Sequence, residues 1–113
     1  MKYIITENKL DSVVSKFMSN KFDKLTTFKS KIFPTGLFYI DKNGNIIAEV
    51  IKGHSHSGGV ILDWELWKEV SDFFGFETIR EQQDSISLWA DNYFTLKDSL
   101  IDFREFTKTI DDL

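Results

Sequence analysis

Residues 37–51, Leu-Phe-Tyr-Ile-Asp-Lys-Asn-Gly-Asn-Ile-Ile-Ala-Glu-Val-Ile, constrain the fold more than any other part of the sequence. Two runs of β-branched and aromatic residues flank a short polar turn that ends in Asn43-Gly44-Asn45. Runs of this composition favour β-strands, and Asn-Gly is a frequent turn dipeptide in β-hairpins. We therefore expect a β-hairpin here, at the centre of a small antiparallel sheet.

The first 33 residues predict a helix followed by a less regular segment. Apolar residues recur at the spacing of one helix face from Leu10 to Met18, and Thr6 is suited to cap the first turn. We expect this helix to end near Asn20. Residues 22–33 mix Thr and Lys with isolated apolar residues, which favours an irregular or edge strand whose lysines discourage pairing with other chains.

After the hairpin, residues 52–59 predict a glycine-rich loop, and residues 63–93 predict two helices. Asp63 begins the first of these helices, and Gly75 follows it where a left-handed C-terminal cap belongs. Thr78 and Glu81 have the spacing of a capping box, which indicates a further helix that runs to about Tyr93. Residues 95–113 fit either a helix or a short strand, and we favour a helix.

Together these elements predict an α+β fold. It consists of an N-terminal helix, a small antiparallel sheet around the hairpin, and two or three helices packed on one face of that sheet. A chain of 113 residues is long enough for one modest core. We expect a single domain over residues 1–113, in which residues 95–113 can form a loosely attached tail.

Composition excludes several kinds of chemistry. The sequence has no cysteine, which removes disulfides, thiolate metal sites and thiol nucleophiles. No segment has the roughly 20 consecutive apolar residues that a membrane-spanning helix needs, and the first residues do not form a signal peptide. We therefore expect a soluble cytoplasmic protein that makes no use of a membrane and holds no cofactor.

Aromatic residues are abundant, with eleven Phe, three Trp and three Tyr. Large rings bury a large area per residue, so most of them are expected in the core. Any aromatic side chain that stays exposed is a natural anchor for a protein partner, because aromatic residues dominate binding energy at interfaces. The candidates for such anchors are Trp64, Trp67 and Tyr39.

The two halves of the chain carry opposite charge. Residues 1–52 contain nine lysines and five acidic residues, whereas residues 53–113 contain five basic and thirteen acidic residues. The region Lys16–Lys31 is the most basic, through Lys21, Lys24, Lys29 and Lys31. This pattern is compatible with solvated surface lysines, with self-association of the two halves in a homodimer, and with nucleic-acid binding as a less favoured alternative.

His54 and His56 are the residues best suited to hold a metal ion. Residues two apart face the same side of an extended segment, so both imidazoles could reach one divalent cation, with a nearby carboxylate as third ligand. A metal-dependent hydrolase is therefore an alternative function. We favour the simpler alternative, in which the two histidines of this glycine-rich loop are solvent-exposed.

Residues Met1–Glu7, the central hairpin, and the segment from Trp64 towards Trp89 resemble small uncharacterised proteins from marine metagenomes, of phage origin. The resemblance covers about the first 95 residues and implies no known activity or site residues. It does imply a small viral protein that acts as an adaptor or modulator of host machinery. We therefore predict a non-enzymatic interaction domain whose partner is a host protein or a second copy of the chain.

Overall fold

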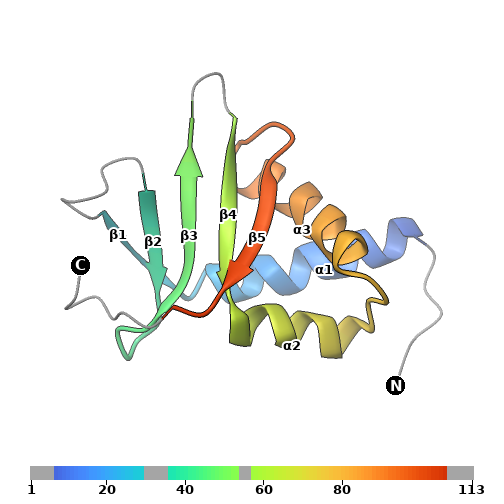
Figure 1. The fold of residues 1–113 in the computed structure, drawn as a ribbon, viewed down its shortest axis with the longest axis horizontal. Coiled ribbons are helices and arrows are strands. Elements are labelled where there is room, and N and C mark those ends of the chain that lie inside the picture. The colour runs from blue at the N-terminus through green and yellow to red at the C-terminus, as the bar shows by residue number, and fades with distance from the viewer. Residues whose placement is uncertain (1–6, 30–35, 54–56, 107–113) are drawn as a thin grey trace.

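The computed structural model describes residues 7–29, 36–53 and 57–106 (Figure 1). Within these ranges the chain forms three helices and five strands. In chain order they are α1 (Glu7–Phe22), β1 (Thr26–Lys29), β2 (Gly36–Ile40), β3 (Ile46–Lys52), β4 (Gly58–Asp63), α2 (Trp64–Phe74), α3 (Ile79–Tyr93) and β5 (Leu100–Arg104). The predicted α+β fold, with an N-terminal helix and helices packed after the sheet, is confirmed.

The strands form one mixed sheet in the order β1-β2-β3-β4-β5. The first three pairings are antiparallel, as in the predicted sheet, but β5 pairs with β4 in parallel. A parallel neighbour needs a long crossover connection, and α2 and α3 provide it between β4 and β5. The sheet is therefore larger than predicted and has one parallel strand at its edge.

The central hairpin is confirmed and is stabilised within its own turn. One Asp41 side-chain oxygen accepts hydrogen bonds from the backbone N–H groups of Asn43 (2.8 Å) and Asn45 (3.0 Å). Gly44 has a φ of 83°, a conformation that glycine adopts without steric cost. The register shifts after Tyr39, which marks a bulge in the pairing of β2 with β3.

The predicted caps of α2 and α3 are also present, whereas Thr6, the predicted cap of α1, lies outside the described residues. Asp63 is the N-cap of α2, and its side chain accepts from the N–H of Glu65. Gly75 takes the left-handed conformation at the end of α2, and Thr78 caps α3 by accepting from the N–H of Glu81. These bonds satisfy backbone groups that a helix end leaves without a partner. The first helix ends two residues beyond its predicted end, at Phe22.

Two predictions in the second half of the chain were wrong. Residues 100–104 form β5 and not part of a helix, and β4 begins at Gly58, inside the predicted loop. The apolar residues of the last segment fit a helix and a strand equally well, and hydrogen bonding to β4 selects the strand. Residues 107–113 of the predicted helix lie outside the described residues.

The two faces of the sheet differ. Figure 1 shows all three helices on one side of the sheet, which we call the helix face. There Val50, Val60 and Leu62 join the main core with α1, α2 and α3. On the opposite side, the open face, Phe38, Ile40 and Ile46 form a second apolar cluster with Phe28 and Phe106 packed against it. Among the described residues, no helix combines the length and apolarity needed to cross a bilayer.

Candidate protein-interaction surface

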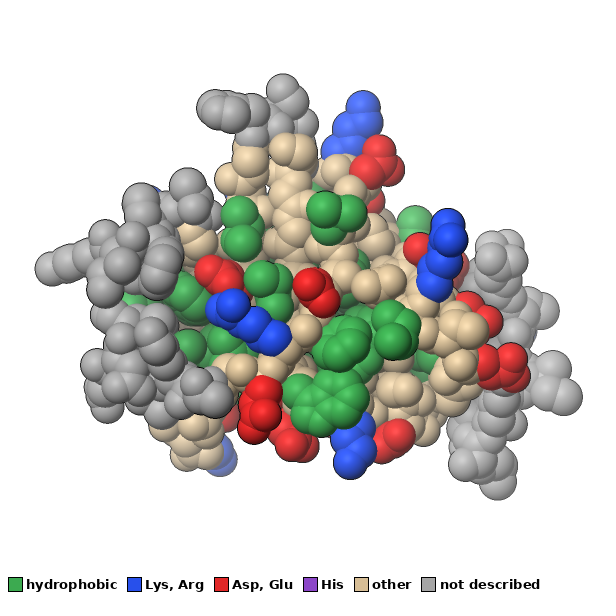
Figure 2. All heavy atoms as spheres, in the orientation of Figure 1, with side chains coloured by type: hydrophobic (Ala, Val, Ile, Leu, Met, Phe, Trp, Pro, Cys, Tyr) green, Lys and Arg blue, Asp and Glu red, His purple; other side chains and the backbone are tan. Residues whose placement is uncertain are grey.

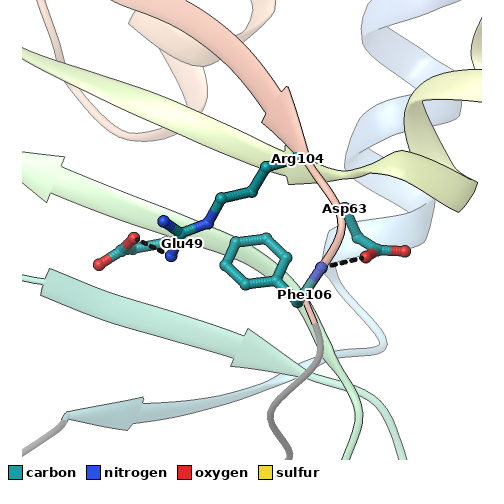
Figure 3. Close-up of polar contacts among 4 residues, drawn as sticks. All are labelled: Glu49, Asp63, Arg104 and Phe106. Atoms are coloured by element: carbon teal, nitrogen blue, oxygen red, sulfur yellow. Dashed lines mark hydrogen bonds and ion pairs between the residues drawn. The ribbon is translucent and has the colours of Figure 1, made fainter.

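Asp63 connects three parts of the fold at the end of β4. Its Oδ2 accepts from the backbone N–H of Glu65 at 3.1 Å, which caps α2. Its Oδ1 accepts from the backbone N–H of Phe106 at 3.2 Å (Figure 3). One carboxylate therefore holds the start of α2 and the chain that follows β5, although Phe106 is 43 residues away in sequence.

Glu49 is an acidic residue in an apolar setting on the open face. Its partners in the neighbouring strands are Phe38 and Ile61, and only 9% of Glu49 is exposed. Arg104 reaches across from β5, and its Nη2 lies 3.4 Å from Glu49 Oε1 (Figure 3). Burying a carboxylate without such a partner is costly, so Arg104 is the group that makes Glu49 tolerable there.

Arg104 also contacts an aromatic ring. Its guanidinium carbon lies 4.6 Å from the centre of the Phe106 ring, a distance typical of a cation–π contact. More than half of the Arg104 side chain, 56%, is nevertheless exposed. The residue is therefore held in place by Glu49 and Phe106 while part of it remains available to another molecule.

Three aromatic side chains pack together where β5 meets the first turn of α2. The Phe103 ring is stacked on Trp67, with centroids 4.5 Å apart, and lies 5.4 Å from Trp64. Figure 2 shows hydrophobic side chains gathered over the region between β5 and α2. We refer to Trp64, Phe103, Arg104 and Phe106 as the Trp64 surface.

The Trp64 surface has the composition of a protein-binding surface. Trp and Arg are the residue types most enriched among those that dominate protein–protein binding energy. Among residues 7–29, 36–53 and 57–106, no group of three or more His, Cys, Asp or Glu is placed to hold a metal ion. The arrangement can therefore bury aromatic area and offer a guanidinium to an acceptor.

The three predicted anchors lie in different environments. Trp64 is 41% exposed, whereas Trp67 is 3% exposed and belongs to the main core. Tyr39 is half-buried on the helix face against Phe22 and Phe94, and burial raises the pKa of its hydroxyl. Trp64 is the only one of the three whose ring is substantially accessible.

The basic residues of the predicted nucleic-acid-binding region also lie in different environments. Lys21 Nζ lies 3.1 Å from a carboxylate oxygen of Glu69 on α2, so its charge is paired. Lys24 and Lys29 are exposed, the latter on β1, and Lys31 lies outside the described residues. Nucleic-acid binding by this region remains a prediction.

His54 and His56 also lie outside the described residues. The prediction that they hold a metal ion therefore stays a prediction.

The sequence analysis missed Arg104 and Phe106. Both lie within residues 95–113, which we expected to be helical, and a helix would not have brought Arg104 to Glu49 on β3 or Phe106 to the apolar cluster of the open face. A usable signal was present in Leu100–Arg104, where apolar and charged residues alternate after the first position as in a half-buried strand.

Comparisons with protein-family models, curated proteins and solved structures found no match to this chain.

Proposed function

We propose that this chain is a small non-enzymatic protein-interaction domain, an adaptor or modulator, that binds a partner protein through the Trp64 surface. The observation that carries this proposal is the exposed Trp64 ring, which packs at a tilt against Phe103, together with the half-exposed side chain of Arg104, the residue that follows Phe103 in β5. A large ring held by packing loses little side-chain entropy when it binds.

The chemistry of the surface suggests the kind of partner. Trp64 and Phe106 offer apolar area, and Arg104 offers N–H donors that a carboxylate can accept as a bidentate pair. Both oxygens of Asp63 already accept backbone hydrogen bonds, whereas 56% of the Arg104 side chain is exposed, so N–H groups of its guanidinium beyond the Glu49 contact are accessible. A partner segment with an apolar side chain next to an acidic one would match both features.

The test is affinity capture of partners from a host lysate, with the full chain and its Trp64→Ala variant as parallel baits. We expect a distinct protein to remain bound to the wild-type chain in high salt and to be lost from the Trp64→Ala bait. The apolar contact makes the first result salt-resistant, because exposed charge pairs are screened and buried aromatic area is not.

Leu100→Ala is the matched control, since Leu100 is 78% exposed on the open face and lies outside the Trp64 surface. This variant should retain the partner. Equal capture by the wild-type and Trp64→Ala baits would contradict the proposed surface. Recovery of nucleic acid that elutes at modest salt would support the basic region Lys16–Lys31 in its place.

A further inference from the structure

A second exposed apolar area lies between α1 and α2, away from the Trp64 surface. The Phe17 ring of α1 is stacked on Phe73 of α2, with centroids 5.5 Å apart. Phe73 is 59% exposed, and Val13, one turn before Phe17, is 42% exposed. We call Val13, Phe17 and Phe73 the helical strip. An exposed aromatic strip of this kind is a feature of protein-binding surfaces.

The strip lies between two helices that run in opposite directions. Phe17 contacts Phe73, and Lys21, one turn further along α1, pairs with Glu69, one turn earlier in α2. When the residue number rises by four along α1, the number of the contacting residue in α2 thus falls by four. The helices are therefore antiparallel along the strip.

The two sides of the strip carry opposite charge. On α1, Lys9 and Lys16 are exposed and lie four residues before and three residues after Val13, so both are its neighbours on the helix surface. On α2, Glu69 lies four residues before Phe73, and the exposed residues Glu65 and Asp72 lie next to Glu69 at the same helical spacing. Lys9 and Lys16 thus form a basic border on α1. The border on α2 is acidic on balance, because Glu65, Glu69 and Asp72 outnumber the exposed Lys68 that lies among them, and Glu69 is the one that pairs with Lys21 across the strip.

We propose that the helical strip binds a second copy of this chain in a two-fold symmetric dimer. A two-fold interface brings one surface against an identical surface, so that surface must complement itself. An axis parallel to α1 and α2 would lay α1 of each copy over α2 of its partner. The apolar centres then meet, and the basic border of each copy lies over the acidic border of the other.

Charge complementarity favours a second copy over an unrelated partner. A partner of uniform charge would be attracted to one border and repelled by the other, whereas a second copy matches both. The apolar centre supplies the burial, and the charges fix the orientation. This inference is independent of the Trp64 surface, which lies at the opposite end of α2 from Phe73 and would be present twice in the dimer.

Sedimentation velocity of the purified full chain, over a series of concentrations, tests the proposal. We expect the wild-type chain to move from monomer to dimer as concentration rises. Phe73→Ala should weaken dimerisation at least tenfold, while Leu100→Ala, which removes an even more exposed side chain from the open face, should leave it unchanged. Circular dichroism of each variant checks that the fold is retained.

Charge-reversal variants distinguish a two-fold symmetric dimer that forms through the helical strip from other modes of self-association. Lys16→Glu alone and Asp72→Lys alone should each weaken the dimer, because like charges then face each other twice. An equimolar mixture of the two variants should restore it, since both contacts in the mixed dimer again join opposite charges.

Three results would overturn the proposal: a wild-type chain that stays monomeric at the highest concentration it tolerates, a dimer that Phe73→Ala leaves intact, or a mixture no tighter than either charge variant alone. Trp64→Ala separates the two proposals, because it should abolish partner capture and leave the dimer unchanged.

Discussion

Thr95 adopts a backbone conformation that β-branched residues rarely take. It follows the last turn of α3 with a φ of 56°, in the left-handed region. The N–H of Leu96 donates to the carbonyl of Asp91 at 3.0 Å, the longer of the two bonds that close a Schellman motif. Glycine usually occupies this position because it has no Cβ to clash. The chain therefore carries local strain at the turn that leads into β5.

Thr95→Gly should stabilise the protein. Relief of the left-handed strain is worth roughly 1–2 kcal/mol, and the greater freedom of glycine in the unfolded chain offsets about 0.5–1 kcal/mol of it. We expect a net gain of about 0.5–1 kcal/mol in the free energy of unfolding, measured by urea denaturation. Thr95→Ala is the control, since it keeps a Cβ. A similar gain from both variants would show that strain is not the cause.

Tyr93 forms a short hydrogen bond whose effect depends on pH. Its hydroxyl donates to Asp23 Oδ1 at 2.6 Å. Burial, this hydrogen bond and the charge of Asp23 raise the pKa of Tyr93 from 10.0 to about 12. The folded state thus favours the neutral phenol, so the stabilisation is complete below the unfolded pKa and is lost as pH rises from about 10 to 12.

The stability of the wild-type chain should therefore fall between pH 10 and 12 more steeply than that of Tyr93→Phe. The absorbance of tyrosinate should show one group that ionises near pH 12 in the wild-type chain and is missing from the variant. Asp23→Asn should lower the pKa of Tyr93, since it removes the neighbouring negative charge. Parallel stability curves for wild type and Tyr93→Phe would refute this account.

At the scale of elements, α3 protects the outer edge of β5. Gln83, Ser87 and Asp91 are spaced four residues apart and so line one face of the helix. The Gln83 side chain donates to the carbonyl of Ile101 at 2.9 Å, and Ser87 Oγ donates to the carbonyl of Ser99 at 2.8 Å. Asp91 accepts from the N–H of Ser99 at 3.0 Å. These side chains take the place of a further strand and occupy backbone groups that could otherwise pair with another chain.

Gln83→Ala should weaken this edge. The lost hydrogen bond to Ile101 is worth about 1 kcal/mol of unfolding free energy, slightly reduced by the higher helix propensity of alanine. Asp84→Ala is the matched control, because Asp84 is exposed on the same turn and its change should cost less than about 0.5 kcal/mol. Equal costs for the two variants in urea denaturation would show that the edge bond does not contribute.

At the scale of the whole molecule, one aromatic cluster joins the first, middle and last parts of the chain. Phe22, at the end of α1, is 1% exposed. Its ring centre lies 4.8 Å from that of Trp89 on α3, 5.2 Å from that of Tyr39 on β2, and 5.8 Å from that of Phe94. Packing of this kind couples the helices to the sheet, so its loss affects the whole fold.

Phe22→Ala should lower the free energy of unfolding by about 3–5 kcal/mol, because it leaves a cavity among these rings. This loss is a large fraction of the total free energy of unfolding of a typical domain, which is roughly 5–15 kcal/mol. Phe73→Ala, at an exposed position, should cost far less. Thermal denaturation of both variants, at a protein concentration where each is monomeric, measures the difference. Comparable losses would contradict the division into core and surface aromatics.

How much of the fold could be predicted depends on how many residues of sequence separate the groups that interact. The caps at Asp63, Gly75 and Thr78 and the turn after Asp41 involve neighbours within four residues, and their residue types were sufficient to place them. The candidate surface was only partly predictable. Trp64 and Trp67 are the same residue type three positions apart, and nothing in composition separates the exposed ring from the buried one.

The sequence by itself determined α1, α2, α3 and the hairpin, with boundaries that agree to within two residues for the described residues, because these elements depend on the periodicity and capping of adjacent residues. Only the tertiary structure decided that residues 100–104 are a strand, that Arg104 pairs with Glu49 at a separation of 55 residues, and that Phe103 stacks on α2. The physical reason is that a short segment such as β5 gains its stability from the elements it meets, and those partners are set by the packing of the whole chain.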